Sequence, residues 1–309
     1  MRLGDATWPE VETIARRDAH DQAPAPIVLV PIGSTEQHGP HLPLATDTII
    51  AEELAGRAVH HTDGLMIGPT IGVSASGEHA DFPGTLSLGS QVMSSVIVEL
   101  VRSADWAAGV VLVNGHGGNH QAISDAVALL AAESRQVLSW WPSWPQRLDG
   151  GPADLHAGRI ETSMMLAIDP GLVRLELAVP GADASIDDLR ERGVRAVSSS
   201  GVLGDPDGAS GGEGERFITA FVEDLVHQIE RWRDRLVADD DALGGWIETH
   251  PATDAQQLRA LVRQVRKDLK EGRPGESPRQ GKAFRELFQF VRAQLAVHDD
   301  ADHGEQAAA

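Results

Sequence analysis

Residues 26–33 read Pro-Ile-Val-Leu-Val-Pro-Ile-Gly, an apolar run that ends at a glycine. A run of this kind, without polar alternation, is typical of a strand buried on both faces of a parallel sheet. Similar strands are expected at residues 65–67, 109–113 and 136–141, and amphipathic helices at residues 47–61, 91–103 and 119–133. This alternation predicts an α/β fold, in which a mostly parallel sheet is covered by helices on both faces.

Potential metal ligands follow two of these strands directly. Residues 33–44 read Gly-Ser-Thr-Glu-Gln-His-Gly-Pro-His-Leu-Pro-Leu, and residues 114–120 read Asn-Gly-His-Gly-Gly-Asn-His. Loops at the carboxyl ends of parallel strands are where α/β folds bind their ligands. The two loops together predict a metal-dependent hydrolase.

Four side chains in and near these loops are candidate ligands. Glu36 and His38 are two residues apart, which places both on one side of an extended loop. Asp47 lies at an expected helix N-terminus, where a carboxylate is favoured and could bridge two ions. His116 lies in a glycine-rich turn that allows close backbone approach to a metal or substrate. The alternative is a plain strand–helix turn with Asn119 as its N-cap, but it leaves the first loop unexplained.

A third segment adds an acid and a histidine. Residues 154–163 read Asp-Leu-His-Ala-Gly-Arg-Ile-Glu-Thr-Ser. Glu161, at the start of an expected helix, is predicted to be a further metal ligand and to take part in catalysis, and His156 is predicted to carry the proton. Asp154 is expected to act as the orienting partner of His156. The alternative is an ordinary helix N-terminus with an acidic first turn, and the two other loops favour the functional interpretation.

Composition narrows the class of protein further. The 309 residues carry a formal net charge of -20, which argues against nucleic acid or an anionic membrane as the main partner. There is no cysteine, so any metal must be bound by His, Asp and Glu, a donor set that suits Zn²⁺, Fe²⁺ or Mn²⁺. No signal peptide or membrane-spanning stretch is evident, and we expect a cytoplasmic protein.

The three ligand-rich segments, residues 33–43, 114–119 and 156–163, resemble the signature segments of the creatininase (creatinine amidohydrolase) family. The resemblance extends over residues 26–236. It implies a three-layer α/β/α sandwich, two divalent metal ions per subunit, hydrolysis of an amide, and a homo-oligomer that is commonly a hexamer.

The same resemblance assigns roles to individual residues. It implies that Glu36, Asp47 and His116 hold one ion, that His38 and Asp47 hold the other, and that His156 is catalytic. Creatininase itself has a Glu two residues after the strand-end His, and this chain has Gly118 there. We therefore expect Glu161 to replace that ligand, and hydrolysis of creatinine itself is not expected.

Within the family, residues 200–210 and the Trp-Trp-Pro stretch at 140–142 most resemble the peptidases of the mycofactocin system. This resemblance implies release of a C-terminal Val-Tyr dipeptide from a modified ribosomal precursor peptide. A creatininase-like hydrolase of a small cyclic amide or formamide is an alternative. A second alternative is a metal-bound scaffold without catalysis in a peptide-modification pathway.

The organisation of the remaining chain is less specific. A long helix is expected at residues 217–236, interrupted by Asp239-Asp-Asp241, so that residues 1–237 form the hydrolase domain and residues 238–309 a helical extension with a disordered tail. His79 and Asp81 lie in a loop that is equally well interpreted as a substrate loop or a structural turn. Trp140, Trp141 and Trp144 could line a pocket, or equally belong to the core or an interface.

Overall fold

The computed structural model describes residues 1–16, 25–133, 135–143 and 153–249. The chain forms two compact units. The first comprises Met1–Val127 and Val137–Ile229, and it contains the sheet and every residue of the site described below. The second comprises Ala128–Gln136 and Glu230–Ala309. Its described part includes the ends of two helices, with Leu130 and Trp232 buried.

Four parallel strands form the sheet of the first unit: β1 (Ile27–Ile32), β2 (Leu65–Ile67), β3 (Gly109–Asn114) and β4 (Val137–Trp140), in the order β2-β1-β3-β4. In the register of the central pair, Val28 lies opposite Val110 and Ile32 opposite Asn114. Every residue of β1 and β3 is buried, which explains why the two runs are apolar throughout. The predicted parallel sheet is confirmed.

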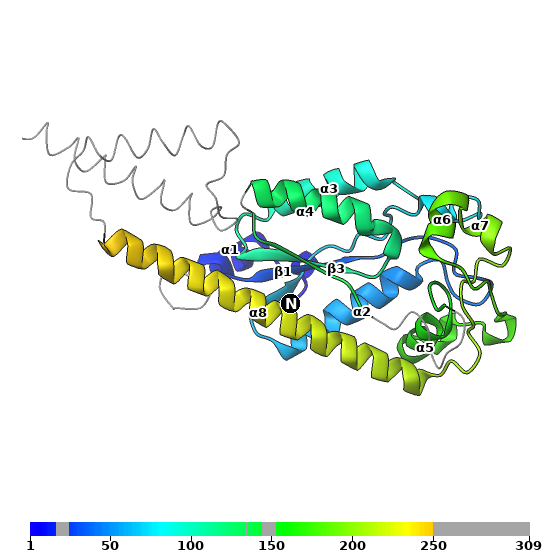
Figure 1. Cartoon of the computed structure of the whole chain (residues 1–309). Coiled ribbons are helices and arrows are strands. Elements are labelled where there is room, and N and C mark those ends of the chain that lie inside the picture. Colours follow the sequence, from blue (N-terminus) through cyan, green and yellow to red (C-terminus); the bar gives the residue numbers. More distant parts are fainter. Residues whose placement is uncertain (17–24, 134, 144–152, 250–309) are drawn as a thin grey trace, which may run out of the picture. The chain divides into compact units, whose positions relative to one another are not determined.

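Helices cover both faces of this sheet (Figure 1). The helix α2 (Thr46–His61) follows β1, α3 (Ser90–Ser103) follows β2, and α4 (His120–Ala132) follows β3. Connections between parallel strands are right-handed, and the chain reverses its direction across the sheet after β2. The reversal places α2 on one face and α3 and α4 on the other, so the predicted α/β/α sandwich is confirmed.

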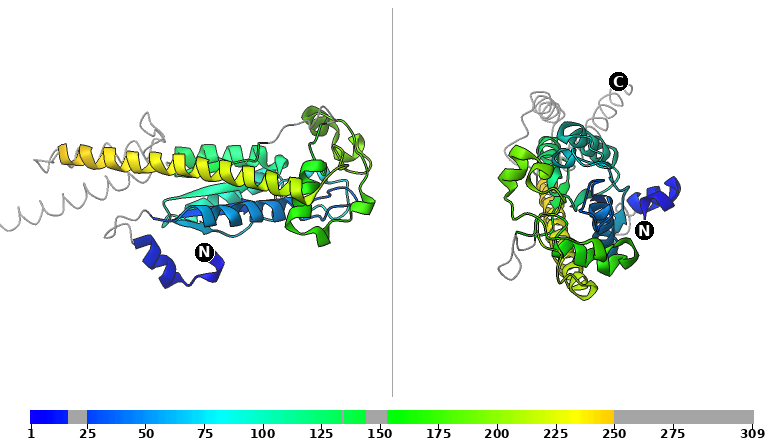
Figure 2. Two further views of the ribbon diagram at one scale, coloured as in Figure 1. Left: turned by 90° about the horizontal axis from the view of Figure 1, so that it is seen from below. Right: turned by 90° about the vertical axis from the view of Figure 1, so that its right-hand side faces the viewer.

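Shorter elements complete the described chain. They are α1 (Trp8–Arg16), α5 (Arg159–Ile168), α6 (Ile186–Arg192), α7 (Val194–Val197) and the 3-10 turns η1 (Leu3–Asp5), η3 (Gly77–His79), η4 (Gly117–Asn119), η5 (Pro170–Leu172) and η6 (Leu175–Leu177). Figure 2 shows α5, α6 and α7, all in green, gathered at the same end of this unit. No helix among the described residues is long and apolar enough to span a membrane.

The last described helix, α8, is longer than the sequence pattern indicates, since it runs over Gly211–Thr249. The acidic run at residues 239–241 does not end it, because Asp and Ala can continue a helix when no proline intervenes. The expected domain boundary after residue 237 therefore falls inside a continuous helix. The expected helices at residues 254–271 and 282–297 lie outside the described residues.

Two glycines let the first turn of α2 lie against the ends of the central strands. A Cβ on Gly33 would collide with the backbone of Thr48, and a Cβ on Gly115 would lie 2.7 Å from the backbone oxygen of Asp47. A residue with a side chain at position 33 or 115 would therefore require the backbone of α2 to move away. The close approach brings the carboxylate of Asp47 between the loops that follow β1 and β3.

Candidate metal centre

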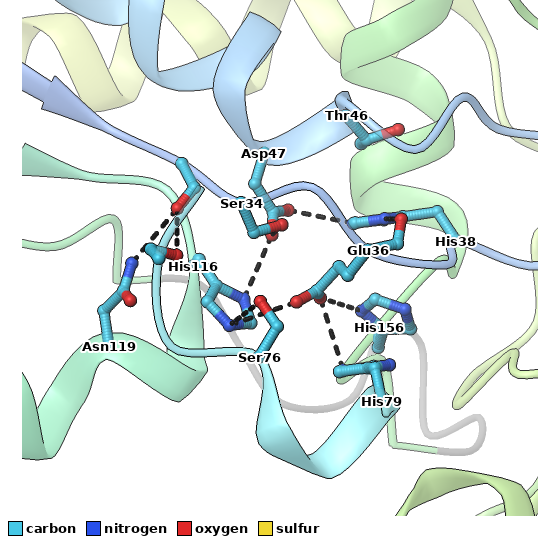
Figure 3. A network of polar contacts seen from close by, with 12 residues as sticks. Ser34, Glu36, His38, Thr46, Asp47, Ser76, His79, His116, Asn119 and His156 are labelled. Atoms are coloured by element: carbon cyan, nitrogen blue, oxygen red, sulfur yellow. Dashed lines mark hydrogen bonds and ion pairs between the residues drawn. The ribbon is translucent and has the colours of Figure 1, made fainter. Parts of the chain in front are cut away.

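The site lies where the loops after β1 and β3 diverge, because β1 connects toward one edge of the sheet and β3 toward the other. Such a switch point is the usual ligand-binding crevice of an open parallel sheet. Glu36 and His38 come from the first loop, Asp47 from the start of α2, and His116 from the second loop. In Figure 3 these side chains converge, with Glu36 between His116, His79 and His156.

A first group is formed by Glu36, Asp47 and His116, all buried. Nε2 of His116 lies 3.1 Å from Oε2 of Glu36, and Nδ1 lies 3.0 Å from Oδ2 of Asp47. Ser34 donates a hydrogen bond of 2.8 Å to the same Asp47 oxygen, which holds the carboxylate in place. The residues that the family resemblance assigns to the first ion are thus in mutual contact.

A second group is formed by His38, His156 and Glu161. Nε2 of His38 lies 2.9 Å from Oδ1 of Asp47 and 3.9 Å from Oε2 of Glu161. Nδ1 of His38 lies 3.1 Å from the backbone oxygen of Glu36 and can donate to it, which leaves Nε2 free to bind. Asp47 therefore contacts one histidine of each group, as expected of a bridging residue.

Glu161 is positioned by the N-terminal turn of α5. Its Oε2 accepts a hydrogen bond of 2.6 Å from the backbone N–H of Ala157, whose φ of 52° lies in the left-handed region. The guanidinium of Arg159 forms two hydrogen bonds, of 2.7 and 2.9 Å, with the carboxylate of Glu213 at the start of α8. This bidentate pair anchors the turn of α5 that carries Glu161.

His156 is oriented by Gln37. Nε2 of His156 lies 2.7 Å from the backbone oxygen of Gln37, to which it can donate. Nδ1 is then free and lies 3.7 Å from Oε1 of Glu36. Asp154, expected to orient this ring, instead accepts hydrogen bonds from the backbone N–H groups of Arg159 and Ile160. Its carboxylate thus caps α5, which is a structural role that the sequence spacing did not indicate.

His79 joins the site as a third neighbour of Glu36, with Nε2 3.3 Å from Oε1 of Glu36. One ligand atom each of Glu36, His79 and His156 lies within 4.8 Å of those of the other two. The amide of Gln37 determines which nitrogen of His79 carries the proton. Its oxygen accepts from the N–H of Gly39 and its nitrogen donates to the oxygen of Gly201, so the amide orientation is set. The amide nitrogen lies 2.8 Å from Nδ1 of His79 and 2.9 Å from Nε2 of His156. Because Nε2 of His156 donates to the backbone oxygen of Gln37, the second amide hydrogen goes to Nδ1 of His79, which places the proton of His79 on Nε2, facing Glu36.

Only weak sequence signals point to these additional residues. His79 lies in the loop that the sequence left open between a substrate loop and a structural turn, and Gln37 stands between two candidate ligands without a metal-binding side chain. Asn119 is buried, and its side chain does not form the helix cap of the alternative interpretation. It accepts from the N–H of Ala75 and donates to Asn114 and to the backbone oxygen of Gly33, which ties three loops together.

The tryptophans after β4 differ in role. Trp140 is buried, and its indole N–H donates a hydrogen bond of 2.8 Å to Asp224 of α8, which favours the core interpretation. The ring of Trp141 lies 5.3 Å from that of His120, at the start of α4. Trp144 lies outside the described residues.

Burial and charge shift the pKa values of these groups strongly. Burial raises the pKa of Glu36 to about 7, and that of Glu161 to about 8. Burial alone would lower the pKa of His38, but the carboxylates of Asp47, Glu161 and Glu36 outweigh burial and raise this pKa to about 10. In the same way Glu36 and Asp47 outweigh burial and raise the pKa of His116 to about 10. Burial opposes ionisation of Asp47, yet His38 and His116 hold its pKa well below the usual range.

The residues fit divalent cations by an observation that is independent of the family. Both carboxylate oxygens of Glu36 are buried and accept no well-aligned hydrogen bond from the described residues, since the nearest ring nitrogens, of His116 at 3.1 Å and His79 at 3.3 Å, do not have hydrogen-bond geometry. A buried carboxylate without a hydrogen-bond donor is costly unless a cation compensates it. The surrounding donors are imidazole nitrogens and carboxylate oxygens, the set that Zn²⁺, Mn²⁺ and Fe²⁺ accept.

We expect metal affinity to fall as the pH is lowered, because the ion must displace protons from its ligands. With pKa values of about 10, His38 and His116 are protonated at neutral pH in the metal-free chain, and Glu36 is protonated below about pH 7. Each displaced proton changes the affinity about tenfold per pH unit. Titration calorimetry with Zn²⁺ in buffers of different ionisation enthalpy should show proton release, and an affinity independent of pH between 6 and 8 would contradict this assignment.

Comparison with known proteins identifies the relatives of this architecture. The family model "Creatinine amidohydrolase" matches residues 4–229. The chain is 44% identical over 232 residues to a mycofactocin precursor peptide peptidase of Mycolicibacterium smegmatis, an alignment that covers 72% of this chain and 90% of the relative. It is 28% identical over 254 residues to the creatinine amidohydrolase of Pseudomonas putida, with 74% and 95% covered.

Solved creatininase structures have the same fold. A mutant creatininase of Zn–Zn type aligns with a TM-score of 0.64 and 25% identity, over 74% of this chain and 96% of the other. A manganese form of creatininase aligns with a TM-score of 0.58 and 25% identity, over 74% and 97%. Creatininases thus bind divalent metals on this fold, in agreement with the donor set found here.

A different relative matches the C-terminal part. The family model "Dual-action ribosomal maturation protein DarP" matches residues 219–292. The chain is 46% identical over 81 residues to that protein of Cupriavidus pinatubonensis, over 26% of this chain and 36% of the relative. The chain therefore spans about a third of that relative.

Across residues 4–229 the family model, the peptidase relatives and the creatininase structures agree. The protein belongs to the creatininase family of metal-dependent amide hydrolases.

Proposed function

We propose that this protein is a peptidase with a dinuclear metal centre that releases a C-terminal Val-Tyr dipeptide from a modified mycofactocin precursor peptide. The observation that carries the proposal is the convergence of two ligand groups on Asp47, in a chain 44% identical to peptidases of that name. The hydrolysis of a small cyclic amide or formamide is the rival activity, since creatininases share the fold.

Each group is assigned one ion in this proposal. Glu36 and His116 would hold the first ion and His38 and Glu161 the second, and Asp47, which contacts a histidine of each group, would serve both. When bound, divalent ions supply a nucleophilic water at neutral pH and polarise the carbonyl of the amide. Metal analysis of the purified protein identifies which of Zn²⁺, Fe²⁺ or Mn²⁺ is bound.

His156 is the catalytic residue of the proposal. Its Nε2 is held by the backbone oxygen of Gln37, and its Nδ1 is free and directed toward Glu36. Burial and the nearby His38 lower the pKa of His156, which keeps Nδ1 unprotonated before the reaction. Nδ1 can therefore accept the proton of the attacking water and pass it to the leaving nitrogen.

The function is tested by incubating the purified full chain with a synthetic peptide ending in Val-Tyr. We expect free Val-Tyr by mass spectrometry, loss of activity with a chelator, and recovery on adding Zn²⁺, Fe²⁺ or Mn²⁺. A peptide ending in Tyr-Val is the matched control. Turnover of formamides or lactams but not of either peptide would favour the rival hydrolase. Bound metal with no turnover of any amide would indicate a scaffold.

Replacing Gln37 by Glu should impair the same reaction. The carboxylate cannot donate to Nδ1 of His79 or to the oxygen of Gly201, so the tautomer of His79 is no longer set. Loss of such an orienting partner typically costs about 10- to 100-fold in activity or metal affinity. Gln91→Glu, at an exposed position in α3, is the control. An unchanged kcat/KM, together with unchanged ¹⁵N shifts of His79, would contradict the orienting role.

We also propose that the protein is a homo-oligomer, with the hexamer implied by the resemblance. Exposed apolar side chains support an interface, among them Leu86, Leu88 and Val92 near α3, and Leu172, Leu175 and Leu177 after α5. Light scattering coupled to size exclusion measures the mass directly. A particle of 33.0 kDa, the mass of one chain, would contradict the proposal.

A second candidate function concerns the C-terminal part, for which we propose binding to ribosomal particles. The support is the match of residues 219–292 to a ribosomal maturation protein. Residues 255–292 hold ten Lys and Arg against four Asp and Glu, although the whole chain is strongly acidic. This proposal departs from the expectation based on total charge, because binding to a polyanion depends on the local density of cations.

Co-sedimentation of the full chain with purified ribosomal subunits tests this second function. Binding that weakens as salt is raised is expected from contacts with RNA phosphates. The control variant replaces Arg263, Arg266, Lys267 and Lys270 by Glu, which reverses the charge of one segment without touching the metal centre. Equal sedimentation of the unchanged chain and the variant, or no sedimentation of either, would contradict the proposal. Dipeptide release should be the same for both proteins.

A further inference from the structure

Glu78 brings an acidic side chain to the metal centre that the proposed reaction does not use. It belongs to η3, and its Oε1 lies 3.6 Å from Nε2 of His116. Its side chain is 26% exposed, whereas those of Glu36 and Asp47 are buried. Glu78 thus reaches the same ring nitrogen of His116 that Oε2 of Glu36 contacts at 3.1 Å.

The backbone leading to Glu78 supplies further acceptors to the same nitrogen. Nε2 of His116 lies 3.0 Å from the backbone oxygen of Ala75 and 3.4 Å from Oγ of Ser76. Together with the carboxylates of Glu36 and Glu78, these atoms favour a proton on Nε2. Nδ1 then keeps a free lone pair on the side of Asp47. Histidines that bind metals commonly donate their other N–H to a carbonyl or carboxylate in this way.

Gly118 leaves the space that this arrangement needs. A Cβ at residue 118 would collide with Oε1 of Glu78 and Nε2 of His116, and would lie 2.6 Å from the backbone oxygen of Ala75. The carboxylate of Glu78 could move away from such a Cβ, but the backbone of Ala75 and the ring of His116 could not without disturbing the ligand. Residues 75–78 can therefore lie this close to His116 only because residue 118 has no side chain.

We infer that Glu78 is a positioning residue for His116, and that Gly118 is required because residues 75–78 occupy the place of any side chain there. The inference rests on the metal centre of the proposed function. The inference does not depend on which amide is cleaved, because what it predicts is the affinity of the first ligand group for its ion.

Competition between the metal-free full chain and a chromogenic chelator for Zn²⁺ tests the role of Glu78. We expect two bound ions in the unchanged protein, and in Glu78→Gln a loss of about tenfold or more in the affinity of one of them. Asp81→Asn is the matched control, because it neutralises an exposed carboxylate three residues along the same loop. The thermal midpoint of the metal-free chain should be the same for both variants, since a merely structural role would change it. Equal Zn²⁺ affinity of Glu78→Gln and Asp81→Asn would overturn the inference.

Gly118→Ala tests the second half of the inference. We expect one Zn²⁺ to be lost, while the ion assigned to His38 and Glu161 is retained and reports that the chain is folded. Adding Glu78→Ala to Gly118→Ala should not restore the lost ion, because Ala75 and His116 still block the methyl group. Two tightly bound ions in Gly118→Ala would overturn this part. If Gly118→Ala does not fold, the comparison of Glu78→Gln with Asp81→Asn decides.

Failure of the proposed function and failure of the positioning role of Glu78 give different experimental results. A wild-type chain that binds no divalent ion would contradict the proposed function itself. A chain that binds two ions equally well with and without the Glu78 carboxylate would leave that function standing and contradict only the positioning role.

Discussion

Replacing Asp47 by Asn is expected to abolish the binding of both ions and to reduce kcat/KM for the Val-Tyr peptide by about 1,000-fold or more, since each metal contributes several kcal/mol to the transition state. The reason is the central position of this carboxylate, whose two oxygens lie 2.9 Å from His38 and 3.0 Å from His116. An amide has one oxygen instead of two and carries no charge, so it cannot serve both groups.

Asp47→Asn should also destabilise the metal-free chain. Asp47 is ionised at neutral pH because His38 and His116 hold its pKa well below the usual range. Removing one partner of a buried charge pair typically costs about 3–5 kcal/mol, because the remaining charge is left without compensation. Chemical denaturation and metal analysis measure both effects, with Asp125→Asn on the exposed face of α4 as the control. Full metal content in Asp47→Asn would refute its bridging position.

Replacing Glu161 by Gln is expected to have the second large effect. Unlike Asp47→Asn, it should reduce metal binding and activity without destabilising the metal-free chain. We expect loss of the second ion and a fall in kcat/KM of about 100-fold or more, since a neutral amide is a poor ligand for a divalent cation. The metal-free chain should change in stability by no more than about 0.5 kcal/mol. Burial raises the pKa of Glu161 to about 8, so at pH 7 the side chain is already neutral and Gln resembles it.

The hydrogen bond that Glu161 accepts from Ala157 can be kept by the amide oxygen of Gln, so α5 should still begin at Arg159. Glu176→Gln, exposed in η6, is the matched control. Two ions and full activity in Glu161→Gln would remove Glu161 from the ligand set. Loss of stability equal to that of Asp47→Asn would instead mean that Glu161 is charged in the metal-free protein.

The pattern of residues was sufficient to predict those features that depend on side-chain type and on neighbours close in the chain. The strands β1 and β3 are buried on both faces, and their continuous apolar sequence follows directly from that. Glu36, His38, Asp47 and His116 were identified as candidates because they directly follow strands or begin a helix. The structure links these four side chains in one chain of contacts, from His38 through Asp47 and His116 to Glu36.

Residue pattern was insufficient wherever the partner of a side chain comes from a distant loop. Asp154 precedes His156 by two residues, yet it caps α5, while Gln37, 119 residues away, orients the ring. Nothing in the spacing of residues 77–84 distinguishes a turn from a site. In the structure Leu86, which follows this loop, pairs with Thr35 in the loop after β1, and His79 lies beside Glu36. The acidic run in α8 likewise continues a helix that composition alone would end.

The amino-acid sequence by itself determined the order of strands and helices, the burial of the central pair, and the set of carboxylates and imidazoles available to a metal, because these depend on side-chain type and on neighbours close in the chain. Only the tertiary structure decided which nitrogen of each histidine is free, and which residue stands beside Gly118. Those outcomes depend on contacts between loops that diverge from adjacent strands, and the distances across such a crevice are set by the packing of the whole sheet and its helices.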